Sequence, residues 1–414
     1  MKNLITENLS NPGSLEQLYR SNPTGFKHSF QEIYPEIRSE LIAQIWHVRL
    51  QYSHEEITWG ARKDWAFAGI LAVLGALWMH LPTLFPILKD VYFARNTAFI
   101  FMSGIAAYLA RKQRLSRSKL LIPILIGLSS LIYVNALPVK ASSDTLFLTY
   151  VHLPILTWLI VGHIFCGAQI SVTEKRINFL RFHGDLLVMS AVIMLAGGLF
   201  SALTIGLFKL IDIHIEEFYG KYFIASVLPS VPLLATVLVH QNPTLVSKIS
   251  PVIARIFTPL VSAMLMIFLV TFIFTGKDPY NDREFLLLFN GILIGVMALL
   301  LFSISESTKG AVSQFQLISL VLLAFLAIIN NGIALSAIVF RLAELGITPN
   351  RIAVLGSNSL ILLNLIWVAR QLIGLFNGKK NLQDVELSMT RFLPYYALWV
   401  AIVSFIFPLI FSFQ

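Results

Sequence analysis

The stretch "RLAELGITPNR", residues 341–351, lies between two of the most apolar segments of the chain. Gly346 suits the left-handed backbone position just past a helix end, because glycine has no side chain to clash there. Thr348 is a good N-cap, since its hydroxyl can accept a hydrogen bond from the next helix, and Pro349 suits the first helical position. The stretch therefore predicts a helix end, a tight turn and a new helix start.

The charges in this stretch have a structural interpretation. Arg341 and Glu344 are three residues apart on a helix and can pair. Arg351 follows Asn350 in the first turn of the second helix, where a cation opposes the helix dipole at a cost of roughly a few tenths of a kcal/mol. We expect either a salt bridge to Glu344 or an external anion to offset that cost, so Arg351 is also a candidate binding residue.

Composition assigns the chain to a broad class. Of its 414 residues, 56% are hydrophobic and 13% charged, and the mean hydropathy is +0.75. Soluble domains carry about 25% charged residues, so we expect an all-α polytopic membrane protein embedded in a lipid bilayer. The net charge of +9 fits cytoplasmic loops rich in Lys and Arg, and we expect no nucleic-acid partner.

Motifs of catalysis and of cofactor binding are missing from the sequence. A single cysteine, Cys166, excludes a disulfide framework and a cysteine zinc site within one chain. The chain has no HExxH, no GxSxG and no glycine-rich phosphate loop before a lysine. The sequence therefore predicts no catalytic residue, no metal site and no cofactor.

Two parts of the chain differ in polarity. Residues 1–64 are polar and helix-patterned, whereas residues 65–414 consist of successive apolar runs. In the first part, Ser14 and Gln17 fit a capping box, and Pro35 suits the start of a helix that presents apolar residues on one face. We expect a cytoplasmic helical module in residues 1–64 that packs on the membrane domain, lies along the bilayer or binds a protein partner.

The apolar runs predict about eleven membrane spans, since each needs roughly 20 residues to cross the hydrocarbon. Of the 31 Lys and Arg residues, 21 fall on the side of the N-terminus and 8 on the other, which predicts a cytoplasmic N-terminus. The expected spans are 65–88, 91–110, 120–137, 145–168, 185–211, 222–240, 256–275, 285–303, 314–337, 349–374 and 392–412.

A polar stripe runs along the tenth expected span. Asn350, Ser357, Asn364 and Gln371 repeat every seven residues, which is nearly two helical turns, so they share one face. Amides facing lipid would lack partners, so this face meets protein or water. It is either an interhelical hydrogen-bonded seam, at about 0.6 kcal/mol per contact, or the wall of a hydrated cavity.

The stretch "INNG", residues 329–332, interrupts the ninth expected span. Asn330 and Asn331 either loosen the helix at membrane depth, where a broken helix exposes backbone to a ligand, or mark an ordinary helix end.

The segment "FRLAELGITPNRIAVLGSNSLILLNL", residues 340–365, resembles the bacterial family of multi-span membrane proteins catalogued as domain of unknown function 4153. The N-terminal "LEQLYRSNPTGFKHSF" and "WHVRL" are similar to the leader region of some members. The resemblance implies a protein of the bacterial cytoplasmic (inner) membrane. The family has no established activity, so it supplies no catalytic residues.

Two function classes follow from these features, with a membrane-embedded enzyme third. The first is a permease or channel-like protein for a small solute, favoured because many chains with ten or more spans are transporters. The second is a non-catalytic scaffold or regulatory protein that binds a partner through residues 1–64. Transport predicts a wet cavity at mid-membrane, and a scaffold predicts dry packing there with an exposed apolar face on the N-terminal helices. The candidate path comprises Asn330, Asn331, Asn350, Arg351, Ser357, Asn364 and Gln371.

Overall fold

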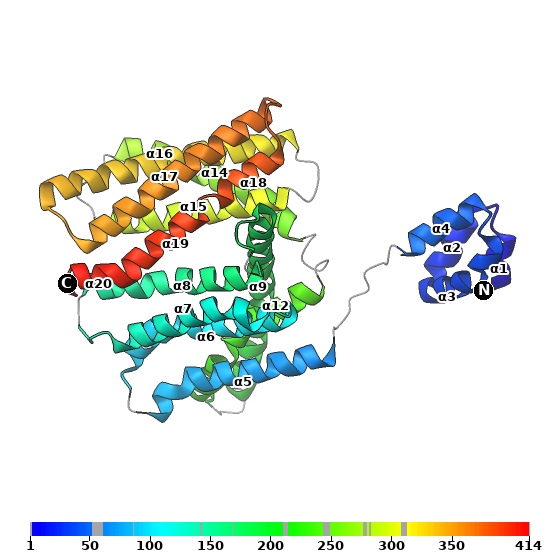
Figure 1. Cartoon of the computed structure of the whole chain (residues 1–414), viewed down its shortest axis with the longest axis horizontal. Helices are drawn as coiled ribbons and strands as arrows, with labels where there is room; N and C mark the ends of the chain where they lie inside the picture. The colour runs from blue at the N-terminus through cyan, green and yellow to red at the C-terminus, as the bar shows by residue number, and fades with distance from the viewer. Residues whose placement is uncertain are drawn as a thin grey trace. The chain divides into compact units, whose positions relative to one another are not determined.

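The computed structural model describes residues 2–51, 61–85, 87–140, 143–167, 169–209, 214–242, 249–275, 280, 283–307 and 313–413. The described residues form helices, turns and loops, and divide into two compact units at Trp59 and Gly60. The boundary expected from the sequence lay between residues 64 and 65. Figure 1 shows both units coloured along the chain.

The N-terminal unit is a small helical module with its own apolar core. Leu15, Phe26, Phe30 and Trp46 lie buried in this core, where aromatic rings pack edge to face and in tilted pairs. The module therefore buries a core of its own within its first 51 residues. Its helices are α1 (Lys2–Glu7), α2 (Pro12–Ser21), α3 (Pro23–Ile37) and α4 (Leu41–Gln51).

Two predictions about this unit were wrong. The cap of α2 is Asn11, whose side chain accepts a hydrogen bond from the backbone N–H of Ser14 at 3.2 Å, because Pro12 already occupies the first helical position. Pro35 lies inside the last turn of α3 and does not open a helix. The proline that does so is Pro23, which follows the side-chain cap Asn22.

The second unit contains the apolar helices. Nine helical runs in its described part are long and apolar enough to cross a membrane, so the chain is an all-α polytopic membrane bundle. Seven of the runs are single helices: α5 (Arg62–Leu84), α7 (Arg117–Ala136), α8 (Asp144–Phe165), α9 (Thr173–Lys209), α14 (Ile249–Thr275), α16 (Gln314–Leu345) and α17 (Pro349–Phe376). The run Glu216–Gln241 consists of α10 (Glu216–Phe218), η1 (Tyr219–Ile224), α11 (Ala225–Val227) and α12 (Ser230–Gln241). The run Leu382–Ile410 consists of α18 (Leu382–Thr390), α19 (Leu393–Ala401), η2 (Ile402–Ile406) and α20 (Phe407–Ile410).

Two further helices occupy predicted spans without meeting that standard of length and apolarity. Helix α6 (Lys89–Lys112) contains the predicted span 91–110, but it buries Arg95 and Asn96 against its neighbours. Helix α15 (Arg283–Ser307) contains the predicted span 285–303, and its described apolar part is Asn290–Glu306. Both pack between other helices of the bundle, so their polar side chains find partners in protein.

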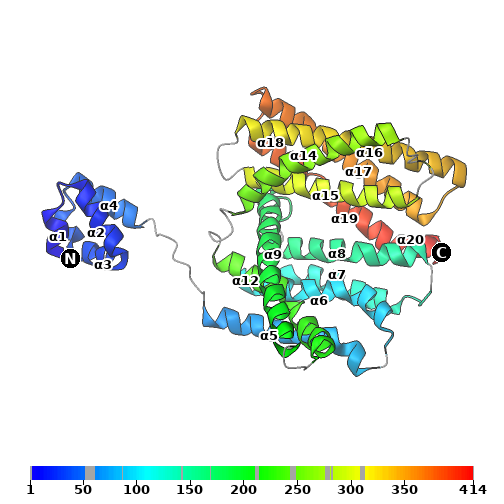
Figure 2. The ribbon, with the colours of Figure 1, turned by 180° about the vertical axis from the view of Figure 1, so that it is seen from behind.

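Helix α9 runs across the direction of the other long helices, as Figures 1 and 2 show. It has 37 residues, roughly 55 Å at 1.5 Å per residue, against about 30 Å of hydrocarbon. It contacts α8, α12, α14, α15 and α18, helices far apart in the sequence. At Gly184 it approaches Phe302 of α15 so closely that any side chain there would overlap the ring. Helix α9 therefore connects α8, which precedes it in the sequence, with α12, α14, α15 and α18, which follow it.

Helices α16 and α17 form an antiparallel pair joined by the turn at Gly346–Thr348. The main apolar core lies between them and α14, α15 and α18, and includes Leu323, Leu365 and Val368. Helix α16 is continuous through "INNG", so the broken-helix and helix-end interpretations of that stretch were both wrong. Asn330 and Asn331 are buried between helices, and a membrane segment must satisfy its backbone hydrogen bonds internally, so the segment stays helical despite the low helix propensities of asparagine and glycine.

Candidate functional site

The turn between α16 and α17 has the predicted backbone. Gly346 takes a positive φ of 79° at the end of α16, and the Thr348 hydroxyl accepts from the backbone N–H of Arg351 at 3.4 Å. The predicted pairing of Arg341 and of Arg351 with Glu344 was wrong, since no such ion pair occurs among the described residues. Arg351 instead donates through Nη1 to the carbonyls of Leu345, at 2.8 Å, and Gly346, at 2.7 Å.

This contact accounts for a cation in the first turn of α17. The last carbonyls of a helix have no partner within the helix and carry the negative end of its dipole. The guanidinium of Arg351 therefore stabilises the end of α16, which offsets its unfavourable place at the start of α17. No external anion is needed at this turn.

Three other arginines make the same kind of contact with a helix end. Arg95 of α6 is 6% exposed and donates to the carbonyls of Asn135, Leu137 and Pro138 at the end of α7, at 3.2, 2.7 and 3.0 Å. Arg176 of α9 donates to the carbonyl of Thr390, the last residue of α18, at 2.8 Å. The bundle thus repeats one contact, a guanidinium at a helix C-terminus.

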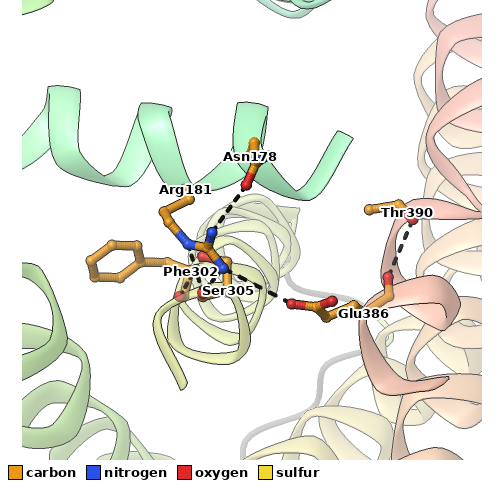
Figure 3. Close-up of polar contacts among 6 residues, drawn as sticks. All are labelled: Asn178, Arg181, Phe302, Ser305, Glu386 and Thr390. Atoms are coloured by element: carbon orange, nitrogen blue, oxygen red, sulfur yellow. Dashed lines mark hydrogen bonds and ion pairs between the residues drawn. The ribbon is translucent and has the colours of Figure 1, made fainter. Parts of the chain in front are cut away.

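The fourth of these arginines is Arg181 of α9, drawn in Figure 3. Its Nε and Nη2 donate to the carbonyl of Ser305, in the last turn of α15, at 3.1 and 3.0 Å. Nη1 donates to Asn178 at 3.0 Å, and Nη2 lies 4.0 Å from the Glu386 carboxylate of α18. One side chain therefore joins three helices. These residues were not predicted from the sequence, because nothing local marks which helix end an arginine reaches.

The predicted polar stripe faces α19 at its two middle residues, Ser357 and Asn364. Ser357 accepts a hydrogen bond from Trp399 Nε1 at 3.0 Å, and Asn364 Nδ2 donates to the Tyr396 hydroxyl at 3.1 Å. Gly356 lies directly under the Trp399 ring, so a side chain there would overlap the indole. These contacts are those of an interhelical seam. Asn350 and Gln371, nearer the ends of the stripe, are partly exposed.

A group of amides lies at the middle of the α16–α17 pair. Asn330 is fifteen residues before the end of α16 and Asn364 fifteen residues after the start of α17, so both lie at one depth, roughly 22 Å from the turn. Asn330, Asn331 and Asn364 are each 0% exposed. Asn330 donates to the carbonyl of Leu326 at 2.7 Å, while the Oδ1 atoms of all three have no hydrogen-bond partner among the described residues.

Two contacts between asparagines were not predicted from the sequence. Asn358 of α17 donates to Asn290 Oδ1 of α15 at 2.6 Å. Asn96 of α6 and Asn135 of α7 exchange two amide hydrogen bonds at 3.0 Å each. A seven-residue repeat could not find these residues, because each pair is made by single asparagines on different helices. Both pairs lie between helices, where polar side chains hold membrane segments together.

The N-terminal unit presents an apolar stripe on α4. Leu41, Ile45 and Val48 recur at helical spacing and are 72%, 57% and 53% exposed, while Ala43, Trp46 and Leu50 on the other face are buried. The unit, residues 1–59, carries five Lys and Arg against seven Asp and Glu, so its net charge is −2. We call Leu41, Ile45 and Val48 the α4 stripe.

The described residues offer no group of three His, Cys, Asp or Glu side chains able to hold a metal ion. Comparison of the chain with protein-family models, curated proteins and solved structures found no match. The resemblance to the uncharacterised bacterial family therefore stays a prediction, and any function must be argued from the geometry above.

Proposed function

We propose that the chain is a membrane-anchored scaffold or regulatory protein whose N-terminal unit binds a helix of a partner protein. The observation that carries the proposal is the α4 stripe, an exposed apolar face on a unit in which Leu4, at 46%, is the other exposed large apolar side chain among the described residues. Three residues at i, i+4 and i+7 form the pattern by which one amphipathic helix packs on another.

The charge of the unit favours a protein over the bilayer as the occupant of this stripe. Helices that lie on anionic membranes combine their apolar face with many Lys and Arg residues. Helix α4 has a single cation, Arg49, which is already paired with Glu16 at 2.7 Å. A unit with a net charge of −2 gains nothing from an anionic surface, whereas an apolar stripe on a partner helix needs no added charge.

The size of the stripe suits a reversible contact. Fully burying a Leu, Ile or Val side chain is worth about 1.5–3 kcal/mol, and these three are each more than half exposed. Covering them yields roughly 3–5 kcal/mol, which does not exceed the cost of association of about 4–15 kcal/mol, so the stripe alone supports only a weak contact that further contacts must supplement. Anchoring both proteins in one membrane would raise their effective concentration.

Site-specific photo-crosslinking in cells tests the proposal on the full chain. A benzophenone side chain replaces Ile45 in one variant and the exposed Glu36 of α3 in the control. We expect one discrete protein adduct from position 45, lost when Leu41→Glu is added, and no such adduct from position 36. Adducts with lipid alone, no adduct, or the same adduct from position 36 would refute the docking role.

A second candidate function, permeation of a small polar solute, rests on the buried amides of Asn330, Asn331 and Asn364. Leaving a buried polar atom without a partner costs about 1–3 kcal/mol, so a solute or water that bound these amides would stabilise them. The depth of these amides matches the mid-membrane position of binding sites in many transporters.

Thiol labelling separates a hydrated path from a dry seam. In a Cys166→Ser background, Asn364→Cys is treated with a membrane-impermeant reagent in intact and in opened cells. Rapid labelling from either side supports permeation along this face. If the cysteine at position 364 is protected from both sides in a variant that remains folded, permeation along this face is eliminated. The role of the stripe is then the hydrogen-bonded seam with α19.

A further inference from the structure

A cavity of about 550 Å³ lies between α7, α8 and α19, with the start of α9 at one end. Ile122 and Ile126 of α7 contribute to its wall and are 57% and 43% exposed, so the cavity opens at the surface of the bundle. Its volume falls within the range of ligand sites, about 300–1,000 Å³. In a membrane, an opening of this kind faces lipid.

The two ends of the cavity differ in polarity. Leu156 and Phe405 line one end, and His163, Cys166 and Arg176 line the other. Along α8, Leu156 and Cys166 are ten residues apart, roughly 15 Å at 1.5 Å per residue. The polar end lies where α8 ends and where α9 and α19 begin, so it is at one surface of the bundle. The cavity therefore has an almost wholly apolar surface, which we call its apolar body, and these polar side chains border it at one end.

Arg176 lies at this end of the cavity, and its Nη1 and Nη2 each carry two N–H groups. Its Nη1 donates to the carbonyl of Thr390 at 2.8 Å and its Nη2 to that of Ser171 at 3.0 Å, which fixes the guanidinium plane. Its Nε and the Nε2 of His163 are buried without a partner among the described residues. No carboxylate in the described ranges lies within 4.0 Å of the Arg176 guanidinium.

We propose that this cavity binds an anionic phospholipid, with an acyl chain along α8 and the phosphate at Arg176. An apolar body of this length suits an acyl chain, and a fixed guanidinium without a carboxylate partner suits a phosphate oxygen. Basic recesses between membrane helices, on the side rich in Lys and Arg, bind anionic headgroups by the same chemistry. The proposal does not depend on the docking role of the N-terminal unit.

Native mass spectrometry of the full chain, purified and delipidated in detergent, tests the proposal. The probes are phosphatidylglycerol and phosphatidylcholine with identical acyl chains. We expect the wild-type chain to retain phosphatidylglycerol in preference, and Arg176→Gln to lower that preference about fivefold, the effect of roughly one cation near a membrane surface. The matched control is Lys175→Gln, which removes the neighbouring exposed charge outside the cavity and should keep the preference.

A second variant tests the apolar body while leaving Arg176 in place, since Arg176→Gln also removes two hydrogen bonds to carbonyls. Ala397→Trp fills the cavity from α19, and Ala202→Trp places the same side chain on an exposed face of α9. We expect only Ala397→Trp to lose the retained phosphatidylglycerol. Three results would each overturn the proposal. The wild type could retain the two lipids equally, or Lys175→Gln could lose as much of the preference for phosphatidylglycerol as Arg176→Gln. A folded Ala397→Trp protein could also retain phosphatidylglycerol fully.

Discussion

Replacing Arg95 by methionine tests whether the arginine contacts at helix ends stabilise the bundle. Methionine has a similar length and fills the same space, but it donates no hydrogen bond. The substitution leaves three carbonyls at the end of α7 without their donor, of which Leu137 accepts in a buried position at 2.7 Å.

The magnitude follows from these bonds. A hydrogen bond to a charged group contributes about 1.5–3 kcal/mol, and the two longer, partly buried bonds contribute less because water can replace them. We estimate a loss of about 3 kcal/mol. At roughly 2 °C per kcal/mol for a large domain, the unfolding midpoint should fall by about 6 °C. Arg95→Lys keeps the charge but serves fewer carbonyls, so its midpoint should fall by about half as much.

The single cysteine of the chain makes the measurement direct. Cys166 is 3% exposed, so a fluorogenic thiol reagent reacts with it only when the bundle unfolds during heating. The matched control is Lys89→Met, which removes an exposed cation from the same helix and should change the midpoint by less than about 1 °C. The reasoning fails if Arg95→Met melts within about 1 °C of the wild type, or if Lys89→Met is equally destabilised.

Three further predictions concern local contacts. Gly356→Ala should lower the unfolding midpoint because its methyl group meets Trp399, and adding Trp399→Ala should relieve that overlap in a double-mutant cycle. Thr348→Ala should lower the free energy of unfolding by about 1 kcal/mol, because α17 loses its cap, whereas Thr348→Ser should change it little; the same melting assay measures both. Hydrogen bonding by Arg20 lowers the pKa of Glu16, so its stabilising effect is present above a pH of about 4.3 and lost as pH falls through the lowered pKa. The protection factors of the amides in residues 2–51, which correct for the intrinsic slowing of exchange in acid, should therefore fall as the pH drops, and less steeply in Glu16→Gln; identical profiles would contradict this.

Helix ends were readable from the sequence where the signal is local. The turn at Gly346, Thr348 and Pro349 was predicted correctly because a cap joins residues only three apart. The same short-range chemistry places Asn22 before Pro23, a signal that the sequence analysis passed over in favour of Pro35. Local capping chemistry thus gives helix starts reliably once cap and proline are read together.

The partners of buried polar side chains were not readable in this way. Arg351 was expected to pair with a carboxylate seven residues away, but the nearby helix end offered carbonyls that needed a donor. Asn358 meets Asn290 only because α15 and α17 pack together, 68 residues apart in sequence. Periodicity gives the face of a helix that is polar, while packing between distant helices decides which group that face meets.

The contacts of α9 set an order in time as the chain is made. Arg181 precedes its acceptor Ser305 by 124 residues, and Arg176 precedes Thr390 by 214 residues. At about 5–20 residues per second of synthesis, roughly 10–40 s pass between the synthesis of Arg176 and that of Thr390, whose carbonyl it binds. Helix α9 therefore enters the membrane with two arginines lacking their final acceptors. The bundle closes only when α18, among the last helices synthesised, reaches it.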